Sequence, residues 1–164
     1  MISDTGSNKI KLRPEVDADS EFLFAVYCSS RRAEVAEFGW DETQQNAFLR
    51  MQFSSRALAY KMQFPMAEYS VILFDDAHAG SLIVSRTDQH ISLTDIAVLP
   101  EYQKNGIGTY VVEQLKGEAA RSNRPLVLRV DKTNIAAKEF YERLGLAVTG
   151  ENQILFEMEW RGIK

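Results

Sequence analysis

The order of helical and strand-like patterns restricts the folds open to this chain more than any other feature of the sequence. A short strand and two helical patterns come first, and three strand-like segments then follow one another directly. Helices interleaved with a run of hairpins favour a mixed sheet over a doubly wound one. We therefore predict an α/β (α+β) fold: a mixed, mostly antiparallel sheet of six to seven strands flanked by four helices, in the order βααβββαβαββ.

The boundaries of these elements follow from hydrophobic periodicity and from residues that begin or end helices. Asp17 is a candidate N-cap for the first helix, Pro65 ends the second helix, and Gly145 caps the last one. In the second helix, Phe48, Met51, Ser55, Leu58 and Met62 follow at spacings of three and four. The expected strands are 10–13, 69–74, 81–86, 90–98, 126–130 and two more before residue 161, and the expected helices are 17–29, 41–64, 108–123 and 136–144.

Length and composition point to one domain without unusual partners. The chain has 164 residues, a net charge of −4 and a single cysteine, Cys28, which lies in an apolar helical pattern typical of a buried thiol. No apolar stretch approaches the roughly 20 residues that span a bilayer. We expect a single domain over residues 1–164 with a flexible tail at 1–9, a cytoplasmic location, and no membrane or nucleic-acid partner. A monomer and a homodimer both remain open.

Gly106 and Gly108 stand between a strand pattern and a helix pattern, in the segment Gln103–Gly108, QKNGIG. Glycine at a helix start can serve a turn that needs positive φ, or it can let a bound anion approach the backbone. The segment lacks the Gly-Lys-Ser/Thr of a Walker loop, and Val111 stands where a dinucleotide fingerprint needs its third glycine. Both nucleotide-binding motifs are therefore excluded.

The same segment resembles the coenzyme-A-binding motif of the GCN5-related N-acetyltransferases (GNAT family), in which Gln or Arg, two residues, Gly, one residue and Gly or Ala open a helix. Residues 134–146, NIAAKEFYERLGL, resemble the second signature of that family, with Leu146 in place of the commoner Phe. The resemblance covers roughly residues 80–150. It implies the GNAT fold, with strands 90–98 and 126–130 parallel and splayed at a cofactor cleft, and acetyl-CoA as cosubstrate.

The resemblance also implies which residues hold the cofactor. The main chain of Ile96, Ala97 and Val98 would pair with the pantetheine arm. The free backbone amides at the helix start would bind the pyrophosphate of the cofactor. The implied cofactor-binding residues are Ile96, Ala97, Val98, Gln103, Lys104, Asn105, Gly106, Ile107, Gly108, Thr109, Asn134 and Tyr141. Asn134 can equally be an ordinary helix N-cap.

Two residues are candidates for proton transfer. Tyr141 matches the family's general acid, which protonates the departing thiolate, although it can also be a packing aromatic beside Phe140. Asp95 precedes the pantetheine-pairing segment and is the candidate base, with a structural role or a water chain as alternatives. The earlier strand position that carries a catalytic Glu in some members falls near Ser92 and Thr94 here.

The acceptor is expected to be a primary amine of a small molecule or peptide, bound beside the first two helices. Glu37 and Trp40 are the candidate substrate-binding residues, since an acidic and aromatic lining suits a cationic amine. Trp40 and Phe38 could instead close the core over the helix pair. The two histidines, His78 and His90, have no metal-site spacing, so we expect no metal. A non-catalytic coenzyme A sensor of the same fold is the alternative function.

Overall fold

The structure is a computed structural model, and it describes residues 9–162. The predicted tail at 1–9 lies outside the described residues except for Lys9. The chain divides into two compact units. Unit 1 comprises the chain up to Leu82 together with Ile96–Asn105, and unit 2 comprises Ile83–Asp95 together with the chain from Gly106 onward.

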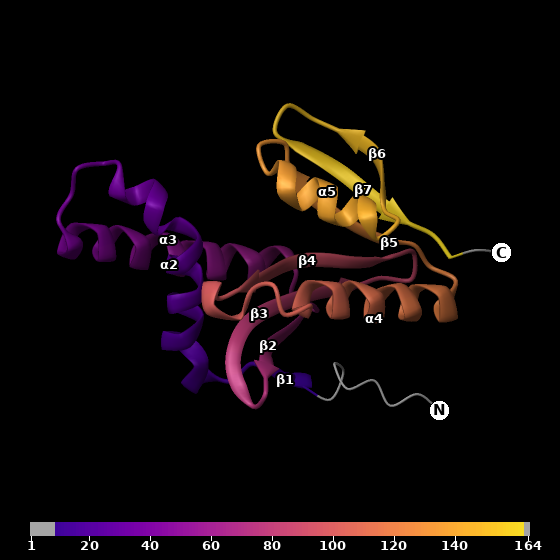
Figure 1. Cartoon of the computed structure of the whole chain (residues 1–164), viewed down its shortest axis with the longest axis horizontal. Coiled ribbons are helices and arrows are strands. Elements are labelled where there is room, and N and C mark those ends of the chain that lie inside the picture. The colour runs from indigo at the N-terminus through magenta and orange to yellow at the C-terminus, as the bar shows by residue number, and fades with distance from the viewer. Residues whose placement is uncertain (1–8, 163–164) are drawn as a thin grey trace. The chain divides into compact units, whose positions relative to one another are not determined.

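The element order is the predicted one (Figure 1). Strands β3 (Ala77–Arg86) and β4 (Ile91–Val98) pass from one unit into the other. Unit 1 also holds β1 (Ile10–Pro14), α2 (Ser20–Ala36), α3 (Glu42–Gln63) and β2 (Glu68–Phe74). Unit 2 also holds α4 (Ile107–Ser122), β5 (Leu126–Asp131), α5 (Ile135–Arg143), β6 (Ala147–Glu151) and β7 (Leu155–Trp160).

The seven strands form one sheet in the order β1-β2-β3-β4-β5-β7-β6. The pairs β1–β2, β5–β7 and β6–β7 are antiparallel, and β4–β5 is parallel. The parallel register runs from Ile91 opposite Leu126 to Leu93 opposite Leu128, while β4 continues to Val98 and β5 to Asp131. The predicted fold class and its parallel strand pair are confirmed.

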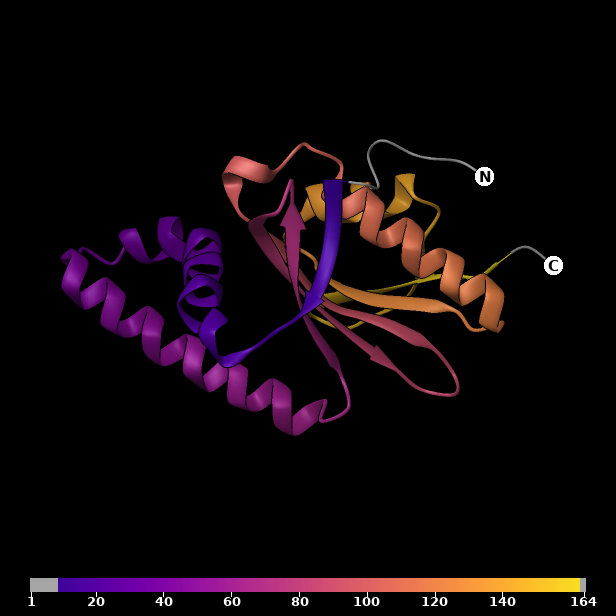
Figure 2. The ribbon, with the colours of Figure 1, turned by 90° about the horizontal axis from the view of Figure 1, so that it is seen from below.

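The helix pair of unit 1 packs around a small apolar cluster. Tyr27, Cys28 and Val35 of α2 and Leu49 of α3 are buried there, so the prediction of a buried thiol is confirmed. Asp41 caps α3 by accepting from the Gln44 amide at 2.8 Å, while the Gln44 side chain accepts from the Asp41 amide at 3.1 Å. This capping box starts a helix of 22 residues, which runs beside α2 (Figure 2).

The residues whose spacing predicts α3 mostly lie on its exposed side. Met51, Leu58 and Met62 are 60%, 64% and 74% exposed, and Phe48 is half-buried. Leu49 and Phe53, which pack on α2, lie on the opposite side of the helix. The periodicity therefore identifies the helix but not its buried face.

The first helix begins later than predicted, and Asp17 is not its N-cap. A single 3₁₀ turn, Asp17–Asp19, precedes α2, and the buried acid is Asp19, which is 4% exposed. Its carboxylate accepts from Arg13 at 2.7 and 2.8 Å and from the Val16 amide at 2.8 Å. The Arg13 guanidinium and the Val16 amide hold the pKa of Asp19 far below its ordinary range. This anchoring of Asp19 on β1 fixes where α2 starts.

The turn between β2 and β3 is also shorter than predicted. Asp75 and Asp76 have φ of 50° and 66°, and β3 begins directly afterwards at Ala77. Two left-handed residues in succession make the tight two-residue hairpin turn, which Asp tolerates better than most residues. The segment 75–80 is therefore mostly strand, with Gly80 inside β3.

Candidate cofactor-binding loop and active site

The segment after β4 is held by its own polar side chains. Leu99 donates its amide to the Ala79 carbonyl at 2.8 Å, and a 3₁₀ turn, Pro100–Tyr102, follows. The Gln103 side chain donates to the Val98 carbonyl at 2.9 Å, and the Asn105 side chain donates to the Tyr102 carbonyl at 3.0 Å. Gln103 and Asn105, both predicted to bind cofactor, thus fix the shape of the loop. Lys104 lies between them and has a left-handed backbone conformation, with φ of 66°.

Glycine is needed at the two positions of the motif for different reasons. Gly106, the N-cap of α4, has φ of +79°, and a Cβ there would meet nothing within 4 Å. Its requirement for glycine is therefore the left-handed backbone. Gly108 is in the helix, and a Cβ there would lie 3.2 Å from Cζ of Phe140 on α5. Gly108 therefore lets α4 and α5 approach each other.

The start of α4 has the features of an anion site. The first hydrogen bond of α4 runs from the Tyr110 amide to the Gly106 carbonyl at 2.9 Å. The amides of Ile107, Gly108 and Thr109 come before it and therefore have no carbonyl partner within the helix. Gly106 offers no capping side chain, and the first turn contains no Asp or Glu. Free amides and the positive end of the helix dipole together favour an anion such as a pyrophosphate. The residues present therefore fit the predicted cofactor group.

The end of β4 passes very close to β3. A Cβ at Gly80 would lie 2.2 Å from the Ala97 carbonyl oxygen and 3.1 Å from Cα of Val98. No other residue type fits at Gly80 unless the backbone of β4 moves. Gly80 thus positions the main chain of Ala97 and Val98, two of the residues predicted to hold the pantetheine arm. The sequence signal is the glycine itself, which lies in the interval between the expected strands 69–74 and 81–86.

The two predicted catalytic residues both belong to unit 2, where the charge of Asp95 acts on Tyr141. Tyr141 of α5 is half-buried, and its ring lies edge-on to Phe140 at 5.2 Å between centroids. Burial, and to a smaller extent the negative charge of Asp95 on β4, raise the pKa of the Tyr141 phenol above its ordinary value. The phenol is therefore protonated at neutral pH. Its hydroxyl makes no hydrogen bond to the part of the chain that the structure describes.

Asn134 is the N-cap of α5, where its side-chain oxygen accepts from the Ala137 amide at 3.1 Å. The capping role is thus observed. Because only the oxygen is used in that bond, the side-chain NH₂ can still donate to a ligand. Asn134 is also exposed.

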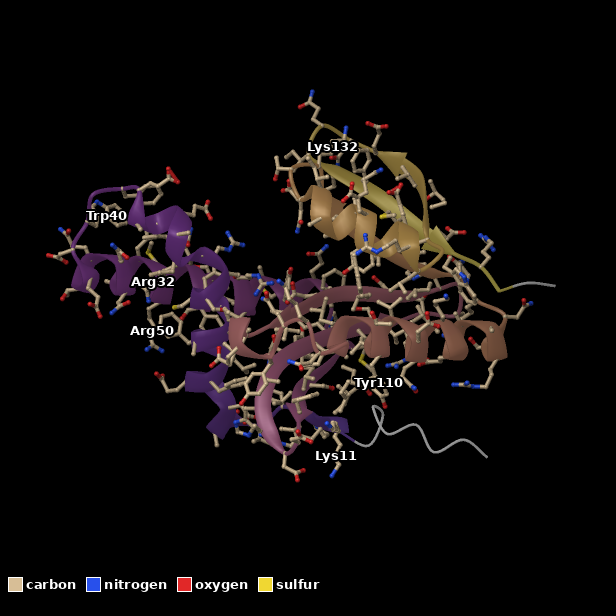
Figure 3. The ribbon with its side chains drawn as sticks, viewed as in Figure 1. Lys11, Arg32, Trp40, Arg50, Tyr110 and Lys132 are labelled. Atoms are coloured by element: carbon tan, nitrogen blue, oxygen red, sulfur yellow. The ribbon has the colours of Figure 1, made fainter. Side chains whose placement is uncertain are left out.

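The predicted acceptor residues lie at the connection between α2 and α3 in unit 1. Glu37 is exposed and ends α2. Trp40 packs edge-on against Phe38 and Phe48, with centroids 5.1 and 5.2 Å away. Phe38 and Trp40 are still 50% and 37% exposed, so the aromatic cluster is a surface feature of the helix pair (Figure 3).

The helix pair also has a surface hollow that was not predicted. A hollow of about 490 Å³ is lined by residues from both helices, among them Cys28, Arg32 and Arg50. Arg50 binds the Glu21 carboxylate at 2.9 Å and stacks 3.8 Å from the centre of the Phe24 ring (Figure 3 labels Arg32 and Arg50). Burial raises the pKa of the Cys28 thiol above its ordinary value, which keeps this thiol protonated.

Two features are absent from the described residues, 9–162. They contain no cluster of three His, Cys, Asp or Glu side chains arranged to hold a metal ion. None of their helices is both long enough and apolar enough to cross a membrane.

Comparison with known proteins identifies the family. A family model described as "Acetyltransferase (GNAT) family" matches residues 31–146, well over half of the chain. No curated protein matches the chain in sequence. Among solved structures, a PaiA N-acetyltransferase from Thermoplasma acidophilum in complex with coenzyme A is 19% identical, with a TM-score of 0.69, and the match covers 93% of this chain and 99% of that one.

Two further solved structures share the fold over most of their length. An acetyltransferase from Thermus thermophilus is 17% identical, with a TM-score of 0.68 and coverage of 93% of this chain and 97% of that one. The N-acetyltransferase PseH from Campylobacter jejuni is 15% identical, with a TM-score of 0.60 and coverage of 93% and 98%. At these identities the likeness shows the fold alone. Together with the family-model match, these findings show that the chain belongs to the GNAT family of acetyltransferases.

Proposed function

We propose that this protein is an acetyl-CoA-dependent N-acyltransferase that moves an acetyl group to a primary amine of a small molecule or peptide. The observation that supports it best is the half-buried Tyr141 phenol, on which the charge of Asp95 acts, in a chain whose α4 start fits an anion. A single N-acetyltransferase domain and a cytoplasmic location belong to the same proposal. A coenzyme A sensor would need the α4 start but not a proton donor.

Acetyl-CoA supplies the acetyl group as an activated thioester. The amides of Ile107, Gly108 and Thr109 bind the pyrophosphate, and the main chain of Ile96–Val98 holds the pantetheine arm. The Asn134 NH₂ donates to the same arm. Lys104 adds positive charge at the loop, while Gln103 and Asn105 keep the loop in shape.

Two residues of the chain carry out the two proton transfers of the reaction. The attacking amine must be neutral, and its nitrogen loses a proton when the new C–N bond forms; Asp95, directly or through water, accepts that proton. As the C–S bond breaks, the Tyr141 hydroxyl donates its proton to the departing sulfur. A main-chain N–H near Val98 stabilises the negative charge on the carbonyl oxygen. Glu37 and Trp40 attract and orient the cationic acceptor.

Binding and turnover are tested separately. For binding, we expect Thr109→Glu to weaken the affinity for acetyl-CoA at least tenfold, because a carboxylate at the α4 start repels the pyrophosphate. Calorimetry measures this affinity. Thr109→Gln, of the same shape without charge, is the matched control. An acidic residue in the first helical turn stabilises a helix, so unfolding would not explain the loss. Equal affinities for Glu, Gln and wild type would place the cofactor elsewhere.

For turnover, an acceptor screen should read thiol release with amino acids, polyamines, aminoglycosides and peptides. Release that requires an amine supports the transferase. Tight acetyl-CoA binding without release for any amine would instead favour the coenzyme A sensor.

A further inference from the structure

The exposed face of α3 carries no charge over its whole length. It contains Ala47, Met51, Ser55, Leu58 and Met62, and its three large apolar side chains are 60–74% exposed. With 100° per residue, the four charged residues of α3 (Glu42, Arg50, Arg56 and Lys61) all lie about 80° or more from the centre of this face. A surface helix normally places charged residues on this side, so the uncharged face is unusual.

The charged residues of α3 are also held toward their own unit. Arg50 pairs with Glu21 on α2, Arg56 lies over the Tyr27 ring at 5.4 Å, and the Lys61 ammonium lies 5.1 Å from the Tyr69 ring centre. None of these cations needs a foreign anion at this face. The face therefore suits a partner surface that is itself uncharged and apolar.

The pattern of the face is complementary to itself when reversed. Met51 and Met62 lie equally far from the midpoint between residues 56 and 57, and so do Ser55 and Leu58. In an antiparallel two-fold pair centred there, Met51 lies opposite the partner subunit's Met62, and the small Ser55 lies opposite the partner subunit's Leu58. Such an interface is isologous, with Met against Met at its two ends and the small Ser55 against Leu58 near its centre.

We infer that α3 is a homodimer interface, in which this face packs antiparallel against α3 of a second copy of the chain. The helix is about 33 Å long, and one helix pair buries less than the roughly 800 Å² per partner of a standard interface. The dimer should therefore be weak, with a micromolar dissociation constant. Adaptable Met side chains are well suited to such a contact.

Sedimentation velocity of the full chain, from low to several hundred micromolar, tests this inference. Wild type should pass from monomer to dimer, and Leu58→Glu should raise the dissociation constant at least tenfold. Ile154→Glu is the matched control: Ile154 is also 64% exposed, but it precedes β7 in unit 2. Circular dichroism should show the same fold for all three. A monomer at every concentration, or a dimer that Leu58→Glu leaves intact, would overturn the inference.

Disulfide trapping tests the register. A disulfide needs Cα atoms within about 7 Å, whereas Met51 and Met62 of one chain are about 16 Å apart along the helix. Under mild oxidation, Met51→Cys chains mixed with Met62→Cys chains should cross-link to a dimer. Each variant alone should not. Cross-linking of each variant alone would mean a parallel pair and would refute the antiparallel arrangement. Cys28, being buried, should not interfere.

Discussion

At the scale of single residues, Tyr141 carries the proposed chemistry. Tyr141→Phe keeps the ring and its contact with Phe140 but removes the proton donor. General acids contribute about 10²–10⁴-fold, and a thiolate leaves readily, so we expect a loss in kcat of about 10²-fold. Acetyl-CoA affinity should stay near the wild-type value, because the hydroxyl acts as charge develops on sulfur. A parallel loss of melting temperature and activity would mark Tyr141 as a packing residue.

The ionisation of Tyr141 gives a readout independent of turnover. Because burial and then Asp95 raise the pKa of this phenol, it should ionise at a higher pH than an ordinary tyrosine. Asp95→Asn removes the negative charge, so the pKa of Tyr141 should fall toward, but not reach, its ordinary value. NMR titration with ¹³C-labelled tyrosine measures this, and Tyr141→Phe assigns the signal. An unchanged titration in Asp95→Asn would show that the two side chains do not interact.

Asp19 controls stability in acid. The guanidinium of Arg13 and the Val16 amide keep the pKa of Asp19 low in the folded state, whereas the unfolded value is about 3.9. The folded state is therefore stabilised above that value, and the stabilisation is lost as pH falls below it. Asp19→Asn should lower the melting temperature at pH 7 by several degrees. The difference from wild type should shrink toward pH 2. A constant difference across this range would contradict the assignment.

At the scale of elements, the crossing of β3 and β4 at Gly80 should be intolerant of substitution. Gly80→Ala places a methyl group against the Ala97 carbonyl, which must shift with the pantetheine-binding main chain. We expect lower stability and acetyl-CoA affinity reduced about tenfold or more. Gly117→Ala in α4 is the matched control. There the methyl group meets only the flexible end of Arg121, and alanine favours a helix. Equal affinity in both variants would mean that β4 does not hold the arm.

The elements were largely predictable because each has a local cause. Period, caps and prolines determine where α3 and α4 run, and Gly145, with φ of +95°, ends α5 as predicted. Gly80 fell outside the expected strand 81–86 because the residue that requires glycine there, Ala97, is 17 positions away in the sequence. The start of α2 was misplaced for the same reason, since the partner of Asp19 is on β1. The exposed side of α3 could not be predicted, because periodicity does not say which face meets α2.

At the scale of the whole molecule, the proposed cofactor residues belong to both compact units. Ile96–Val98 and Gln103–Asn105 fall in unit 1, and Gly106–Thr109, Asn134 and Tyr141 fall in unit 2. A ligand that binds these residues should stabilise the folded chain. At 100 times its dissociation constant, acetyl-CoA should add about 2.7 kcal/mol and raise the melting temperature by roughly 5–10 °C. An unchanged melting temperature would contradict the proposed residue set.

The division into units also distributes the two tryptophans, one to each. Trp40 sits in the aromatic cluster of unit 1, whereas Trp160 of β7 in unit 2 lies 5.1 Å from the Lys116 ammonium. Each unit therefore contains one tryptophan, whose intrinsic fluorescence reports on that unit without any added label. Trp40→Phe leaves emission from Trp160 alone, and Trp160→Phe leaves emission from Trp40 alone. The two single-tryptophan proteins would therefore show, by the wavelength of their emission during heating, whether both halves melt at one temperature or at two.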